Sequence, residues 1–164
     1  MRESSTSLVR VDANLYGEKF HDHILAQYKM FAETADRVSA RRALANSFFL
    51  AANSTLIVVF FFIAKDHIAL ASLVLPILLA VAIGICYIWW RVLASYRQLN
   101  AVKFRMLQQL ERHLPAALYE HEWEQLGCGE VRKKYWPLTG IENWAPVYFT
   151  LLYVFLFAAI SLAS

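Results

Sequence analysis

The chain has 164 residues, of which 59% are hydrophobic and 18% are charged, and its mean hydropathy is +0.39. A soluble domain carries about 45–50% apolar and about 25% charged residues, so this composition excludes an ordinary soluble enzyme. The net charge of +3 suits cationic flanks beside anionic lipid headgroups. Without a basic stripe interleaved with aromatic residues, we expect no nucleic-acid partner.

Residues 1–44 lack the apolar core of a signal peptide but contain a helical stripe. Apolar side chains recur there at intervals of three and four residues, as on one face of a coiled-coil helix: Ile24, Tyr28, Phe31, Ala35 and Val38. The pattern predicts a cytoplasmic amphipathic helix that starts near Gly17 and continues into the membrane.

Residues 45–64 form the first uncharged segment long enough to cross a bilayer core, which takes roughly 20 residues. This segment is the most polar of the three that the sequence contains. Donors left unsatisfied in lipid are costly, so its polar side chains should face other helices or a lumen. The candidate pore or interface residues are Asn46, Asn53, Ser54 and Thr55.

Residues 65–67 read as an external polar turn, and residues 68–90 as a second span that ends in aromatic residues before Arg91. Residues 91–144 then form a cytoplasmic helix, which Pro115 ends, and an aromatic loop. We expect the helix to pack through a second apolar stripe, and a short helix to follow near residues 118–126. The members of that stripe are Val92, Tyr96, Leu99, Val102, Met106 and Leu110.

Residues 145–164 contain no charge and predict a third transmembrane helix; an in-plane helix would usually keep a charged face. The fold class is therefore an all-α integral membrane protein with three transmembrane helices. Its first two helices form a long antiparallel hairpin that extends into the cytoplasm.

The orientation follows from the distribution of Lys and Arg. There are 7 before the first span, 1 in the turn and 8 between the second and third spans. We therefore expect a cytoplasmic N-terminus, an external C-terminus and a location in the bacterial cytoplasmic (inner) membrane.

A hairpin folded near residue 66 places residues whose numbers sum to about 132 at the same height, since both arms rise equally per residue. A cytoplasmic collar is predicted at the membrane surface, able to bind anionic lipid or to gate access. Asp36 and Arg97 either pair, across the hairpin or between subunits, or are solvated. The collar residues are Asp36, Arg41, Arg42, Arg91 and Arg97.

The sequence contains little that points to a metal-binding or catalytic site. His21 and His23 are two residues apart, which on a helix points them to different faces, so they cannot readily share a metal ion. The sequence holds no phosphate-binding loop, nucleophile elbow or paired CxxC, and no acidic or basic side chain lies within the spans. We expect no enzyme, no catalytic residue, no cofactor and no metal.

Three stretches carry a resemblance to a known family: YKMFAETADRVSARRALANSFFLAAN, WWRVLASYRQLNAVKF and LPAALYEHEWEQLGCGEVRKKYWPLTGIENWAP. Together they resemble the RipA-like family of small octameric bacterial inner-membrane proteins, from about Phe20 onward. The resemblance implies a homo-octamer. The layout alone is also similar to SLATT-type membrane effectors of bacterial nucleotide-signalling defence systems.

The sequence thus predicts a non-enzymatic, homo-oligomeric inner-membrane protein that acts as a scaffold or a passive pore. Its expected partners are itself and anionic lipid, and no particular protein partner is indicated. The alternative is a membrane-disrupting effector of a defence or stress system that senses a ligand through its cytoplasmic segment.

Overall fold

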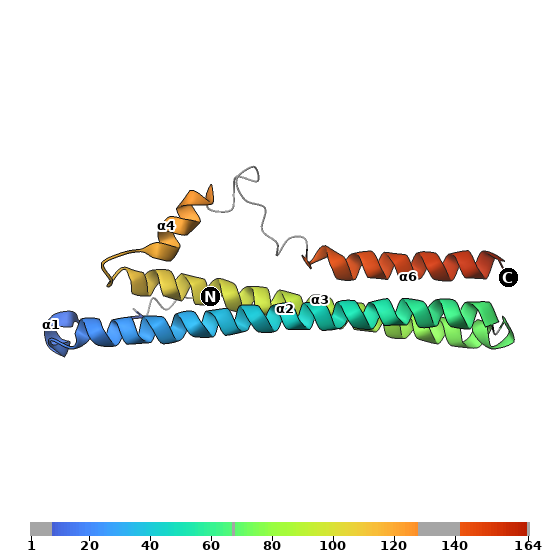
Figure 1. Ribbon diagram of the computed structural model, residues 1–164, viewed down its shortest axis with the longest axis horizontal. Coiled ribbons are helices and arrows are strands. Elements are labelled where there is room, and N and C mark those ends of the chain that lie inside the picture. Colours follow the sequence, from blue (N-terminus) through green and yellow to red (C-terminus); the bar gives the residue numbers. More distant parts are fainter. Residues whose placement is uncertain (1–7, 67, 128–141, 164) are drawn as a thin grey trace, which may run out of the picture. The chain divides into compact units, whose positions relative to one another are not determined.

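The computed structural model describes residues 8–66, 68–127 and 142–163, and all regular structure in them is helical. The helices are α1 (Ala13–Tyr16), α2 (Phe20–Asp66), α3 (Ile68–Glu111), α4 (Leu118–Gln125) and α6 (Trp144–Ala163) (Figure 1). The predicted all-α class is confirmed. The rest of the predicted aromatic loop, residues 128–141, lies outside the described residues.

Three helices are long and apolar enough to cross a membrane, which confirms the three predicted spans. They are the helical stretches Phe20–Lys65, Leu73–Glu111 and Trp144–Leu162. Of the most apolar stretch in each, only 11%, 22% and 22% of the residues are buried in the chain, so most of its surface is left for lipid or for other subunits.

Helix α2 is continuous over 47 residues, as the unbroken pattern after Gly17 predicts. Helix α3 covers 44 residues, tolerates Pro76 in its interior, and ends at Glu111, four residues before Pro115. The prediction of two long helices that pack against each other is confirmed. Lys65 and Asp66, predicted within the turn, are the last residues of α2.

The chain divides into two compact units, and α2 and α3 contribute residues to both. The membrane unit comprises Arg41–Arg97 and Pro137–Ser164, and its described helices are parts of α2 and α3 together with α6. The α4 unit comprises Met1–Ala40 and Gln98–Trp136, with α1, the remaining parts of α2 and α3, and α4.

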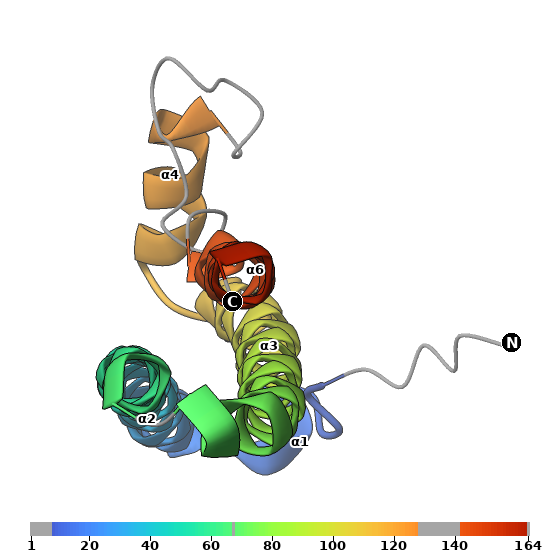
Figure 2. The same cartoon turned by 90° about the vertical axis from the view of Figure 1, so that its right-hand side faces the viewer.

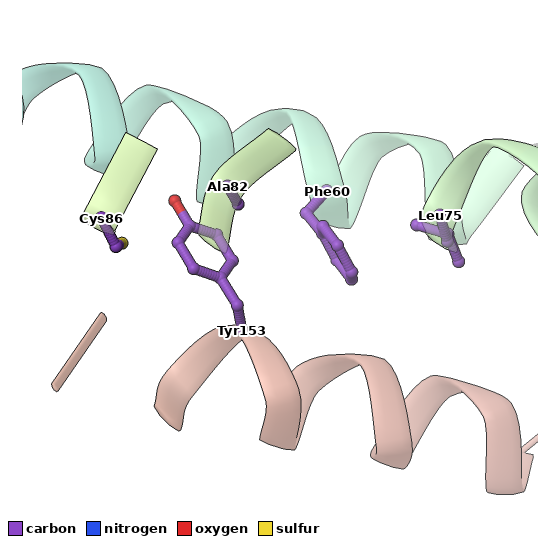
Figure 3. Close-up of a cluster of buried hydrophobic side chains, with 5 residues drawn as sticks. All are labelled: Phe60, Leu75, Ala82, Cys86 and Tyr153. Atoms are coloured by element: carbon purple, nitrogen blue, oxygen red, sulfur yellow. The ribbon is translucent and has the colours of Figure 1, made fainter. Parts of the chain in front are cut away.

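The core of the membrane unit lies where α2, α3 and α6 meet, and the end view in Figure 2 shows these three helices. Side chains from all three helices form it: Phe60, Leu75, Ala82, Cys86 and Tyr153. Figure 3 shows Tyr153 of α6 pointing toward α2 and α3 between Cys86 and Phe60.

A second, smaller core lies in the α4 unit, where Phe20 and Ile24 of α2 pack with Leu110 of α3. The predicted stripe of α2 faces this packing: Ile24 and Ala35 are buried, and Tyr28 is partly buried. The stripe on α2 is therefore confirmed as a packing face.

The stripe predicted on α3 is partly wrong. Its member Leu110 is buried, but Leu99 and Val102 are 45% and 44% exposed, and other buried positions of α3 are Leu93, Asn100 and Leu107. These three positions recur every seven residues, which is the repeat of a helix seam. Apolar periodicity does not predict this seam, because one of its members is the polar Asn100 and its neighbour Leu99 is the apolar residue.

Candidate functional site

The centre of the membrane unit is Asn53 of α2, whose side chain is completely buried. Its Oδ1 accepts a hydrogen bond from the Cys86 thiol of α3 at 3.3 Å and lies 3.2 Å from the Tyr153 hydroxyl of α6. That hydroxyl also donates to the backbone carbonyl of Asn53 at 2.8 Å. The amide nitrogen is used within α2, where Nδ2 donates to the Phe49 carbonyl at 2.8 Å. Asn53 thus joins three helices, and every polar atom of its side chain has a partner.

Asn46 lies two turns earlier on α2, and its side chain also bonds to another helix. The buried indole Nε1 of Trp89, on α3, donates to Asn46 Oδ1 at 3.1 Å. The Trp89 ring stacks on Phe49 with centroids 6.0 Å apart and tilts against Phe149 of α6 at 5.8 Å. Buried Trp N–H groups usually find an acceptor, and Asn46 supplies it here. Asn46 and Asn53 therefore lie at helix contacts within one chain.

Ser54 and Thr55 have a different environment from the two asparagines. Both are exposed, and each hydroxyl donates to a carbonyl of its own helix, Ser54 to Leu50 at 2.9 Å and Thr55 to Ala51 at 3.0 Å. A hydroxyl bonded in this way can face lipid without an unsatisfied donor. These two residues are open to lipid, to another subunit or to a lumen, and their role in a pore stays a prediction.

Arg42 of the predicted collar pairs with an acid two residues before the start of α6. Its Nη2 lies 3.1 Å from Glu142 Oε2, and the two side chains are only 18% and 25% exposed. Arg41, Arg91 and Arg97 are exposed. Asp36 belongs to the α4 unit and Arg97 to the membrane unit, so their pairing stays a prediction.

The α4 unit has a polar centre of its own at Glu111, the last residue of α3, which is 1% exposed. Its carboxylate accepts a hydrogen bond from the Tyr28 hydroxyl of α2 at 2.9 Å. It also accepts hydrogen bonds from the backbone N–H groups of Tyr119 and Glu120 at 3.0 and 3.2 Å. These N–H groups belong to the first turn of α4, whose N-cap residue Ala117 offers no side-chain bond. Glu111 therefore caps α4 from a different helix, which also suits the positive end of the α4 dipole.

Burial, and after it the negative charge of nearby carboxylates, raises the pKa of the two tyrosines close to Glu111. Burial raises the pKa of Tyr28, and the hydrogen bond to Glu111 and the negative charge of Glu111 raise it further. Burial also raises the pKa of Tyr119, followed by the charges of Asp36, Glu111 and Glu122. Both phenols thus remain protonated donors at neutral pH, which keeps the Tyr28 bond to the carboxylate in place.

Asn100 on the α3 seam is a second buried polar side chain of the α4 unit. Its Nδ2 lies 3.2 Å from the Ser39 hydroxyl on α2, while its Oδ1 has no partner among the described residues. One turn later, Lys103 places its Nζ 4.5 Å from the centre of the Phe31 ring. A single polar residue in a helix seam specifies register at a cost in stability, which is the role that this pair suits.

Groups able to hold a metal ion are not found among the described residues. His21 packs its ring on Phe20, and His23 bonds through Nδ1 to the Tyr16 hydroxyl at 2.7 Å, so the two imidazoles serve separate contacts. Cys128 and the basic residues at 132–134 lie outside the described residues.

Sequence reasoning missed Glu111, Glu142 and Tyr153. A signal existed for Tyr153, because a phenol in the middle of an apolar span needs an acceptor in the membrane, and Asn53 is one of the few available. A weaker signal existed for Glu111, which lies four residues after the seam residue Leu107 and just before the helix end. Nothing in the local sequence identifies Glu142 as the partner of Arg42.

The fold and these sites define a class: a helical integral membrane protein whose buried polar groups form hydrogen bonds between its own helices. Residues 25–162 match the octameric membrane protein family. The chain belongs to that family, in agreement with the resemblance seen in its sequence, and it is a homo-oligomeric membrane protein. This is not a family of enzymes. No curated protein and no solved structure gives a significant match.

Proposed function

We propose that this protein is a non-enzymatic scaffold, assembled as a homo-octamer in the bacterial inner membrane. The observation that carries the proposal is the use of the polar groups in the membrane unit. The side chains of Asn46 and Asn53 are used in bonds between helices of one chain, and the exposed surface of the described spans is largely apolar, with the Ser54 and Thr55 hydroxyls bonded to their own helix. A subunit built in this way offers apolar faces for packing and no hydrated path through itself.

The membrane orientation belongs to the same proposal. With the N-terminus in the cytoplasm and the C-terminus outside, the α4 unit extends into the cytoplasm and can present surfaces to other proteins. The exposed Arg41, Arg91 and Arg97 would then contact anionic lipid headgroups. Single cysteines placed near the two termini, labelled from each side of sealed vesicles, test this orientation; labelling of the N-terminal cysteine from outside would contradict it.

A passive pore is the second candidate, because Ser54 and Thr55 form an exposed polar pair within a span. In an octamer, such a pair on each subunit could line a central lumen. The alternative of a ligand-sensing, membrane-disrupting effector would need the same membrane helices to open a leak on a signal from the α4 unit.

Ion flux through proteoliposomes separates these functions. A scaffold gives no flux above that of empty vesicles. A pore gives flux that Ser54→Val with Thr55→Val reduces, while Phe62→Leu, an apolar change at another exposed site of α2, does not. Flux that appears in the wild type and is unchanged in the double variant would contradict both the scaffold and this lumen.

A further inference from the structure

The outer face of α3 in the membrane unit carries two small residues. Ala80 and Gly84 are exposed and lie about one turn apart, on the side of the helix away from the buried Ala82 and Cys86. A Cβ atom added to Gly84 would meet no atom of the described residues within 4 Å, so packing inside the subunit does not account for this glycine. Glycine is a poor helix former, and its place within a span points to a close neighbour outside the chain.

The outer face of α2 carries a similar pair. Ala51 and Thr55 are exposed about one turn apart, on the side of α2 away from the buried Asn53 and Phe60. The Thr55 hydroxyl already donates to the Ala51 carbonyl at 3.0 Å, so another helix can cover this face without burying an unsatisfied donor. Small side chains at such positions let two helix backbones approach closely in a membrane.

The two small pairs lie at the same depth of the membrane unit. The antiparallel helices α2 and α3 rise equally per residue, and the hydrogen bond between Cys86 and Asn53 marks one common level. Two residues nearer the turn on each helix, Gly84 and Thr55 therefore share another level. The indole bond to Asn46 gives the same assignment to within about one helical turn.

Equal depth matters because of the symmetry of an oligomer in a membrane. The chain belongs to a family of octameric membrane proteins, and its Lys and Arg distribution predicts one orientation for every subunit. Subunits of one orientation are related by rotation about the membrane normal, which moves a residue around the ring without changing its depth. A contact between neighbours therefore joins residues of equal depth, and two different faces must meet to close the ring.

The outer face of α6 has a different character, which suits lipid. Its large side chains are 64–88% exposed: Trp144, Tyr148, Leu151, Phe155 and Leu162. Contacts between membrane helices are instead enriched in small residues, because these allow the backbones to come close. A second copy of the chain, rather than lipid, is therefore the occupant that suits Ala80 and Gly84.

We propose that the outer face of α2 packs against the outer face of α3 of the neighbouring subunit, with Ala51 and Thr55 against Ala80 and Gly84. The inference rests on the homo-oligomeric assembly within the proposed function and specifies its contact inside the membrane. Thr55 then belongs to a subunit interface and not to the lining of a lumen.

Side-chain size at this face tests the contact through the mass of the nanodisc-embedded particle, measured by native mass spectrometry. Gly84→Leu and Ala80→Leu should each replace the octamer by smaller species, because overpacking weakens subunit association by roughly 10-fold or more. Inside the subunit a side chain at Gly84 has room and favours the helix, so circular dichroism should show no loss of helix content. Ala158→Leu, the matched change on the exposed outer face of α6, should keep the octamer.

Disulfide cross-linking identifies the two faces that meet. In a chain with Cys86→Ala and Cys128→Ser, Thr55→Cys together with Gly84→Cys should give, on oxidation, a ladder of covalent species up to the octamer. Either new cysteine alone should give no ladder, because the contact joins two different faces. Thr55→Cys with Ala158→Cys is the control pair and should also give no ladder.

Octamers that persist in both Gly84→Leu and Ala80→Leu would overturn the inference and would assign this face to lipid. The absence of a ladder from an octameric chain that carries Thr55→Cys and Gly84→Cys would overturn it as well. A monomeric wild type would instead contradict the homo-oligomeric scaffold, which distinguishes the failure of the proposed function from the failure of this contact.

Discussion

The membrane unit and the α4 unit each place a buried polar side chain where three helices meet, and the two side chains differ in charge. Asn53 joins α2, α3 and α6 through a neutral amide and its backbone carbonyl. Glu111 joins α2, α3 and α4 through a carboxylate. Each residue therefore fastens a third helix to the α2 and α3 pair of its own unit.

The difference matches the proposed position of the α4 unit outside the membrane. A charge within a membrane span costs several kcal/mol, about 2.5–3.5 on insertion scales, so a neutral amide serves there. In the α4 unit a carboxylate can be buried because three donors satisfy it, one of them a phenol and two of them helix N–H groups. Bonds to a charged acceptor are roughly twice as strong as neutral bonds. We therefore expect the contact at Glu111 to be the stronger of the two.

The largest effect is expected from Glu111→Ala, which leaves the partly buried N–H groups of Tyr119 and Glu120 without their acceptor. An orphaned buried donor costs about 1–3 kcal/mol, so α4 should open locally while α2 and α3 stay helical. Hydrogen exchange at the Tyr119 and Glu120 amides measures this opening. Glu111→Gln keeps one acceptor oxygen and should lose less protection; equal exchange in the wild type and Glu111→Ala would contradict the capping role.

A smaller effect is expected from Tyr153→Phe, which removes the hydroxyl that α6 donates to Asn53. Hydrogen bonds between membrane helices contribute about 0.6 kcal/mol on average and up to about 1.7, so the loss should lie in that range. Unfolding in mixed micelles measures it. Ser54→Ala is the matched control, because its hydroxyl bonds only within α2 and its removal should change stability little. An equal loss of stability in both variants would contradict the role of the Tyr153 hydroxyl in joining α6 to α2.

An effect of the same order, about 1 kcal/mol at neutral pH, is expected from Tyr28→Phe, which removes one of the three hydrogen bonds to Glu111. Its pH dependence has a definite sign. The pKa of Tyr28 is raised in the folded protein above its ordinary value of 10.0, so the bond contributes fully below pH 10. Above that pH the unfolded chain ionises first, and stability falls as the pH rises.

Denaturant titrations followed by circular dichroism at pH 9 and pH 11 measure this dependence. The wild type should lose more stability between the two values than Tyr28→Phe does. Tyr119, whose pKa is also raised, contributes a fall in both proteins. Parallel losses in the two proteins would show that Tyr28 is not coupled to Glu111 as the structure indicates.

Much of this fold follows from the sequence. The long uncharged segments identify the spans, and the stripe from Ile24 to Val38 identifies the packed face of α2, because apolar periodicity reports burial directly. The seam of α3 was harder to predict, since Asn100 interrupts it. Periodicity of apolar residues alone cannot detect a buried amide that serves as a seam residue.

The candidate sites were predictable only in part. The sequence singles out Asn46 and Asn53 as polar residues in a span, but their partners Trp89, Cys86 and Tyr153 depend on how three helices meet. Glu111 is harder still, because it caps a helix that begins seven residues later and its Tyr28 partner is 83 residues away. Contacts of this kind depend on tertiary packing rather than on any local pattern.

The Cys86 thiol makes the centre of the membrane unit observable in a living membrane. It is buried against Asn53 under Tyr153, so a thiol reagent can reach it only while α6 is separated from the other two helices. With Cys128 replaced by serine, the rate of alkylation at Cys86 measures how often that separation occurs. Cys86 is thus a native reporter of how often α6 separates from α2 and α3.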